Sequence, residues 1–143
     1  MSYWIFKASP DQYRLDERLK DKEPKIQWRV TRYKDEIKTG DTVFLWRTGK
    51  DRGICAVMNV DSNPEDKNEL ESEQKFYVER DTLVRTRVAG TLTHRIDCIS
   101  SLALKVTPGL ENLSVFSGYQ QATNFKVMPE EGKIIMRLVE AQP

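Results

Sequence analysis

The sequence places tryptophan, the residue best suited to stacking on a planar ligand, at positions 4, 28 and 46. Trp28 follows a polar connection and precedes an expected helix, so we expect its ring at a pocket wall or rim. Trp46 ends an apolar run beside Arg47, and the sequence supports a structural and a pocket role equally. Trp4 lies in an apolar stretch and is expected in the core. An unstacked nucleobase needs such π faces, worth about 1–3 kcal/mol per base, and polar groups for its edge.

A lysine interrupts the apolar N-terminal stretch, at position 7 within YWIFKA. An ammonium group in such a strand is costly unless it reaches water, an anion or a ligand. Lys7 therefore either extends past the strand end into solvent or contacts a ligand. The sequence leaves both interpretations open.

Other kinds of reactive site lack the residues that they require. His94 is the single histidine and adjoins Arg95 in an expected polar turn, so we expect it to be solvated. Cys55 and Cys98 show no metal-binding spacing and are predicted to be buried thiols, with a disulfide as the less favoured alternative. The acidic segment 61–75 does not match a calcium-binding loop. We therefore predict no metal, no cofactor and no catalytic residue, and hence a protein that is not an enzyme.

The composition predicts one domain that spans residues 1–143. Hydrophobic residues make up 38% of the chain and charged residues 31%, which is enough apolar content for a core at this length. The net charge is only +1, so any affinity for nucleic acid must come from local patches. No apolar run approaches the roughly 18 residues of a membrane span, and the N-terminus does not match a signal peptide. We expect a cytoplasmic monomer without membrane contact.

Hydrophobic periodicity predicts short strands and helices in no regular alternation. The expected strands lie at residues 3–8, 26–28, 42–46, 53–60 and the later part of 76–89, with a strand or turn at 96–104. The expected helices begin near Asp11, span 32–38 and begin at Pro129, and residues 61–75 are expected to form a solvated loop. This order does not match the β-α-β rhythm of a doubly wound sheet. It favours a small, mainly antiparallel barrel with peripheral helices.

Several motifs occur along the chain in the same order as in a known family. They are YWIFKASP at 3–10, WRVTRY at 28–33, IKTGDTVFLW at 37–46, GICA at 53–56, ATNFKV at 122–127 and PEE at 129–131. Together they resemble the EVE domain over almost the whole chain. EVE domains belong to the PUA-like superfamily and are related to the YTH readers of N6-methyladenine in RNA. The resemblance implies an α+β fold, a PUA-like pseudo-barrel of mainly antiparallel strands surrounded by short helices.

The resemblance also implies a function and a site. EVE domains are thought to bind modified bases, so it implies a non-catalytic module that reads a methylated or hydroxymethylated cytosine, or another modified base, of DNA or RNA. The implied pocket residues are Lys7 and Ser9 at the mouth, Trp28 as principal stacking wall, Trp46 as second wall, and Thr123, Asn124 and Phe125 in the closing loop. The carboxamide of Asn124 can both donate to and accept from a base edge.

Four arginines are candidates for contact with the nucleic-acid backbone: Arg29, Arg32, Arg85 and Arg87. Each one taken alone is better explained as a solvated side chain. Because the net charge is low, we expect weak affinity with a shallow salt dependence. Two alternatives stay open: a small ASCH-type hydrolase acting on a modified nucleoside with Lys7 as base, and a protein-interaction module with a vestigial pocket.

Overall fold

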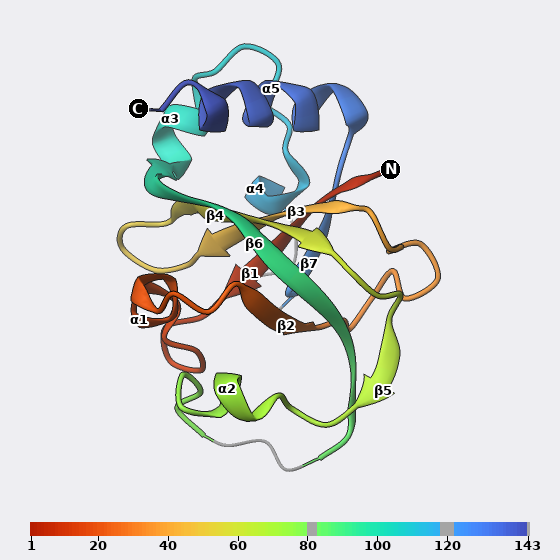
Figure 1. Cartoon of the computed structure of the whole chain (residues 1–143). Coiled ribbons are helices and arrows are strands. Elements are labelled where there is room, and N and C mark those ends of the chain that lie inside the picture. Colours follow the sequence, from red (N-terminus) through yellow and green to blue (C-terminus); the bar gives the residue numbers. More distant parts are fainter. Residues whose placement is uncertain (80–82, 118–121, 143) are drawn as a thin grey trace.

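The computed structural model describes residues 1–79, 83–117 and 122–142, which form a mixed α+β fold on one sheet of seven strands (Figure 1). In chain order, the elements are β1 (Tyr3–Ala8), α1 (Leu15–Lys20), β2 (Lys25–Arg29), β3 (Thr42–Arg47), β4 (Gly53–Val60), β5 (Glu65–Lys67), α2 (Glu71–Gln74), β6 (Arg85–Ser100), α3 (Ser101–Lys105), α4 (Ser114–Ser117), β7 (Asn124–Val127) and α5 (Pro129–Glu140). β1 and β3 run parallel, and the other paired strands run antiparallel. The predicted mainly antiparallel α+β fold is confirmed.

The sheet curls around an apolar interior, but backbone pairing does not close it. Its strand order is β2-β6-β4-β3-β1-β7, with β5 on β6, so β2 and β7 form the two edges of this path. In Figure 1, α3 and α5 lie together at one end of the molecule, and α2 lies at the opposite end. The result is a pseudo-barrel with an opening between β2 and β7. Within the described ranges, no helix is long and apolar enough to cross a membrane.

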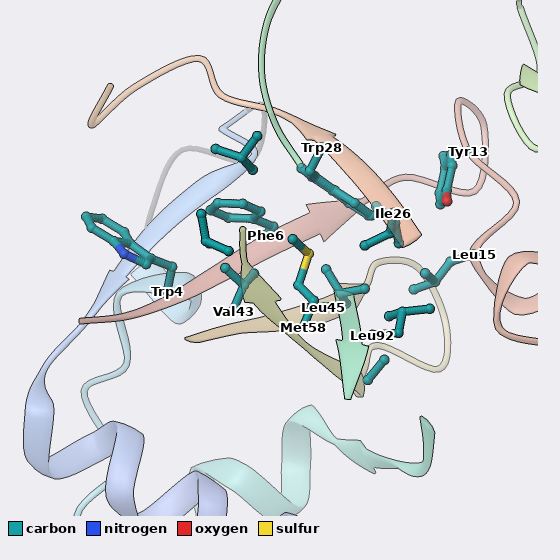
Figure 2. Packing of buried hydrophobic residues seen from close by; sticks show 14 of the residues in the cluster. Trp4, Phe6, Tyr13, Leu15, Ile26, Trp28, Val43, Leu45, Met58 and Leu92 are labelled. Atoms are coloured by element: carbon teal, nitrogen blue, oxygen red, sulfur yellow. The ribbon is translucent and has the colours of Figure 1, made fainter. Parts of the chain in front are cut away.

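Strand alternation divides the apolar side chains between two cores. In β1, Trp4 and Phe6 belong to the interior core, whereas Ile5 belongs to a second core shared with α3, α4 and α5. In β3, Val43 and Leu45 likewise belong to the interior core, part of which Figure 2 shows. Each strand of the curled sheet therefore presents one face to the barrel interior and the other to the helices.

Several elements agree closely with the sequence prediction. β1 and β4 have the predicted bounds, and β3 extends one residue past the predicted range 42–46. α5 begins at Pro129 as predicted, and the side chain of Glu131 accepts a hydrogen bond from the backbone nitrogen of Met128 at 2.9 Å. α1 begins at Leu15, later than the start expected near Asp11.

The helix predicted at residues 32–38 is wrong, because turns occupy this segment. Tyr33 has a φ of 61°, in the left-handed region that a right-handed helix excludes. Asp41, only 3% exposed, also fixes the segment. Its carboxylate accepts hydrogen bonds from the backbone nitrogen of Lys38 and the indole nitrogen of Trp4, each at 2.9 Å. Long-range contact with Trp4 thus outweighs local helix propensity.

The middle of the chain also differs from the prediction. Residues 85–89 of the strand predicted within 76–89 and residues 96–100 of the element predicted at 96–104 belong to one long strand, β6, and α3 takes the rest of the latter; residues 80–82 lie outside the described part of the chain. His94 lies within β6 and not in a turn. The predicted loop 61–75 contains β5 and α2. β6 pairs with β2, β4 and β5, and these long-range pairings extend it past local turn signals.

Cys55 and Cys98 form a disulfide between β4 and β6, so the prediction of two buried thiols is wrong. Their Cα atoms are 4.2 Å apart although 43 positions separate them in sequence. The two strands pair antiparallel, with a register shift between Ile54 and Ala56. Strand pairing therefore decides which sulfurs meet, and sequence spacing does not reveal it.

Candidate functional site

A cavity of about 420 Å³ opens beside Trp28, and we call it the Trp28 cavity. It lies where the ends of β1 and β2, the turn after β1 and the segment after α2 come together. Four residues that the family resemblance implied line it: Lys7, Ser9, Trp28 and Thr123. The fold thus gathers at one place side chains from both ends of the chain.

Trp28 is positioned by β2 and held by other aromatic rings. It is paired with Val88 of β6 and is only 6% exposed, so most of its ring is packed in the interior core. The ring of Tyr13 meets it edge-on, at 5.3 Å between centroids and 69° between planes, and Phe6 lies at 6.4 Å (Figure 2 labels all three). Trp28 therefore offers the cavity a fixed aromatic surface of small area.

Two tyrosines that the sequence analysis did not select add to the aromatic wall. Tyr13 and Tyr77 both line the Trp28 cavity, and their ring centroids are 4.8 Å apart at 61°. Burial, with the charge of Glu73 nearby, raises the pKa of both phenols, so both keep their protons at neutral pH. Tyr77 lies beyond the acidic segment that was predicted to be solvated, and no local pattern marked it.

A buried ion pair supports Tyr13 from behind. Nε of Arg18 donates to Oε2 of Glu73 at 2.6 Å, and the two side chains are 0% and 1% exposed. The hydroxyl of Tyr13 donates to Oε1 of Glu73 at 2.9 Å. Burial raises the pKa of Glu73, and Arg18 opposes this shift. The pair joins α1 to α2, so it fixes both sides of the cavity wall that Tyr13 and Tyr77 form.

Lys7 is half-buried at the end of β1 and lines the Trp28 cavity. Its Nζ lies 5.0 Å from the ring centroid of Phe125. Burial, followed by the positive charge of Arg52, lowers the pKa of the ammonium group. Among the described residues, no carboxylate forms an ion pair with Lys7. An anion or a polar ligand atom at this position would therefore stabilise its charge.

Asn124 has a structural role that differs from the one the resemblance implied. It is 0% exposed, and its Oδ1 accepts a hydrogen bond from the backbone nitrogen of Thr31 at 2.8 Å. Its Nδ2 donates to the carbonyl oxygen of Arg29 at 3.2 Å. The carboxamide thus joins β7 to the chain at the end of β2, across the opening of the sheet. Asn124 is fully buried, bonds to backbone through both polar atoms and does not line the Trp28 cavity, so in this structure its carboxamide is not presented to a base edge as the resemblance implied.

Trp46 does not form a second wall of the Trp28 cavity. Strand alternation places Val43 and Leu45 in the interior core, so Trp46 faces the helices, where it is 3% exposed. There it lines another cavity, of about 790 Å³, which we call the Trp46 cavity. Phe125 lies in β7 and is 0% exposed in the same helix-covered core, whereas the resemblance implied a place in a closing loop over the base.

The four candidate arginines are placed differently. Arg29 and Arg85 line the Trp28 cavity. Arg32 lies over the rings of Tyr33 and Phe125, at 5.0 and 4.8 Å, and its Nε donates to the carbonyl oxygen of Asn124 at 2.6 Å. Arg87 is 1% exposed and donates to the carbonyl oxygen of Lys67. Arg87 is therefore buried, whereas the sequence led us to expect a solvated side chain or a contact with a phosphate. Its burial follows from the pairing of β6 with both β2 and β5.

The polar lining of the Trp28 cavity suits a planar molecule with hydrogen-bonding edges. Lys7 supplies a cation, and Ser9, Gln12 and Thr123 supply neutral donors and acceptors, beside the aromatic surface. Asp11 and Glu79 are acidic lining residues, so the cavity carries charges of both signs. Across the described ranges, no group of three or more His, Cys, Asp or Glu side chains is placed to hold a metal ion.

The fold is that of a PUA-like protein. It consists of an open, mainly antiparallel sheet curled around an apolar core, with short helices and a cavity at the ends of β1 and β2. The family model of the EVE domain matches residues 2–138. The chain therefore belongs to the EVE domain family. The comparison with curated proteins gave no significant match.

Solved structures with the same fold cover nearly the whole chain. Human THYN1 in complex with DNA that contains 5-methylcytosine is 21% identical, covers 100% of each chain and has a TM-score of 0.66. Rpa0253 of Rhodopseudomonas palustris is 15% identical over 98% of this chain and 94% of its own, with a TM-score of 0.70. A hypothetical protein of Leishmania major is 18% identical over 98% and 95%, with a TM-score of 0.69. At these identities, the likeness establishes a shared fold.

Proposed function

We propose that the protein is a non-catalytic reader that takes one modified base of a nucleic acid into the Trp28 cavity. The observation that carries this proposal is the convergence of Lys7, Ser9, Trp28 and Thr123 on a single cavity of about 420 Å³. That volume lies within the usual range for small-ligand sites, about 300–1,000 Å³. Membership of the EVE family and the methylcytosine-containing DNA bound by human THYN1 support the choice of ligand class.

Different residues would recognise the ring of the base and its hydrogen-bonding edge. Trp28, with Tyr13 and Tyr77 beside it, provides apolar contact for the ring and for a methyl substituent. Ser9 and Gln12 provide hydrogen bonds to the edge, in place of Asn124, which is buried outside the cavity lining. A base reaches such a cavity only when it is unpaired or flipped from its stack.

A titration with matched short strands tests the proposal. Single-stranded DNA and RNA that differ by one 5-methylcytosine or 5-hydroxymethylcytosine are compared by tryptophan fluorescence and calorimetry. We expect at least one modified strand to bind severalfold more tightly than its unmodified counterpart. Trp28→Phe should reduce this preference, whereas Tyr3→Phe, an aromatic change outside both cavities, should retain it. Equal binding of all modified and unmodified strands would contradict a modified-base reader.

Lys7 favours a second candidate, a hydrolase that acts on a modified nucleoside. Its lowered pKa and its position in the cavity are the properties that a general base requires. Incubation of the protein with modified nucleosides, followed by chromatography, distinguishes the two functions. Turnover by the wild type that Lys7→Met abolishes would establish the hydrolase and exclude the non-catalytic reader.

A further inference from the structure

The Trp46 cavity, of about 790 Å³, lies on the helix-covered side of the sheet. Lys7 and Trp46 are register partners in the parallel pairing of β1 with β3, so their side chains emerge on the same face. Phe116 of α4 packs edge-on against Trp46, with centroids 6.2 Å apart at 69°. The base of the cavity is thus aromatic, and its position is set by strand pairing.

All charged residues among the described lining of the Trp46 cavity are positive. Lys7, Arg52 and Lys105 line it, and the described lining residues include no Asp or Glu. Nζ of Lys105 lies 5.2 Å from the ring centroid of Phe116. Within the described part of the chain, none of the three cations forms an ion pair with a carboxylate. Three cations around one cavity repel one another, so a bound anion would stabilise all of them.

Hydrogen bonds hold the backbone around these cations, which lie at the end of β1, in the turn before β4 and in α3. The backbone nitrogen of Ser101 donates to the carbonyl oxygen of Arg52 at 2.9 Å, which ties the turn before β4 to the start of α3. Thr48 donates to the carbonyl oxygen of Ala8 through both its backbone nitrogen and its hydroxyl, each at 3.1 Å. The backbone of this cavity wall is therefore held in place by hydrogen bonds within the protein.

The two cavities share one wall. Lys7, Ser9, Gln12 and Thr123 line both the Trp28 cavity and the Trp46 cavity. A strand whose base enters the first cavity would place its next phosphate and sugar against the shared wall. The two cavities differ in character, because the Trp28 cavity contains acidic residues and the Trp46 cavity contains cations without described acidic partners.

We propose that the Trp46 cavity binds the phosphodiester backbone of a nucleic-acid strand, at the nucleotide next to the base held in the Trp28 cavity. This assignment rests on the proposed function. Arg52 and Lys105 contact the phosphate, Lys7 lies between the two nucleotides, and Phe116 and Trp46 contact the apolar face of the sugar or of the neighbouring base.

The test uses a short abasic DNA strand, which offers phosphates without a base to read, and 5-methyl-2′-deoxycytidine, which offers a base without phosphate. The variant Arg52→Gln/Lys105→Gln removes two exposed cations and should keep the fold, which thermal unfolding checks. The control Lys133→Gln/Arg137→Gln removes the same charges from the exposed side of α5, outside both cavities. We expect the first variant to bind the abasic strand roughly tenfold more weakly, and the control to bind as the wild type does.

Separate outcomes distinguish this proposal from the proposed function. Trp28→Phe should weaken the binding of the nucleoside and leave the binding of the abasic strand unchanged. If the nucleoside does not bind the wild type, the base reader is rejected, while weaker binding of the abasic strand by the Arg52→Gln/Lys105→Gln variant still supports the backbone site. Equal binding of the abasic strand to the Arg52→Gln/Lys105→Gln variant and its control, or no binding to the wild type, would overturn the backbone site. Displacement of the strand by an equal concentration of inorganic phosphate would also overturn it, because the site would then bind a free anion.

Discussion

The Nδ2 atom of Asn124 donates a hydrogen bond to the carbonyl oxygen of Arg29 at 3.2 Å, across the opening between the two edges of the sheet. Arg29 follows Trp28 directly, and the same carboxamide accepts a hydrogen bond from Thr31 at 2.8 Å. One side chain thus continues the pairing that the strands leave incomplete, and it holds the strand that carries the main aromatic residue of the candidate site.

Replacement of Asn124 by alanine should lower the free energy of unfolding by roughly 2–4 kcal/mol, because a buried donor and a buried acceptor of the backbone both lose their partner. Urea unfolding measures this change. Ser114→Ala is the control, since its hydroxyl donates to the carbonyl oxygen of Lys126 in β7 at an exposed position and does not touch the Asn124 carboxamide, and it should cost about 1 kcal/mol or less. Similar stability of the two variants would show that the carboxamide does not close the sheet.

The Arg18–Glu73 pair should be costly to break and inexpensive to replace. Glu73→Gln leaves a buried guanidinium without its carboxylate and should cost about 3–5 kcal/mol in chemical denaturation. The double variant Arg18→Met/Glu73→Leu removes both charges and should recover most of that loss. A double variant that is less stable than Glu73→Gln alone would indicate that the pair provides net stability in its own right.

Reduction of the Cys55–Cys98 disulfide should destabilise the protein. A crosslink across 43 positions restricts the unfolded chain by about 4 kcal/mol in the loop-entropy model. Denaturation midpoints measured with and without dithiothreitol test this value. The variant Cys55→Ala/Cys98→Ala is the control and should show no response to the reductant. An unchanged wild-type midpoint after verified reduction would contradict the expected contribution.

Lys7→Met should stabilise the fold and weaken the binding of nucleic acid roughly tenfold or more. The folded-state pKa of Lys7 lies below its usual value of 10.5, so the folded chain holds fewer protons than the unfolded chain between these two values. The free energy of unfolding of the wild type should therefore rise relative to that of Lys7→Met as the pH rises through that window, so the difference between the two proteins should narrow. Denaturation midpoints of both proteins, measured from pH 7 to above pH 10, test the sign. A difference that widens with rising pH would refute it.

The sequence by itself determined the parts of the fold that depend on local pattern. Alternating and continuous apolar runs located β1, β3 and β4, and a proline followed by two acids located the start of α5. Ordered motifs identified the family, and the family resemblance pointed to Trp28, Lys7, Ser9 and Thr123, which line one cavity in the structure.

Only the tertiary structure decided which face and which partner each remaining residue has. Trp28 and Trp46 appear similar in sequence, but strand alternation sends them to opposite sides of the sheet. Asn124 is occupied by backbone groups more than 90 positions away, and Glu73 is buried against Arg18 and not solvated. Local patterns do not carry such information, because it arises when strands distant in sequence pair and bring their side chains together.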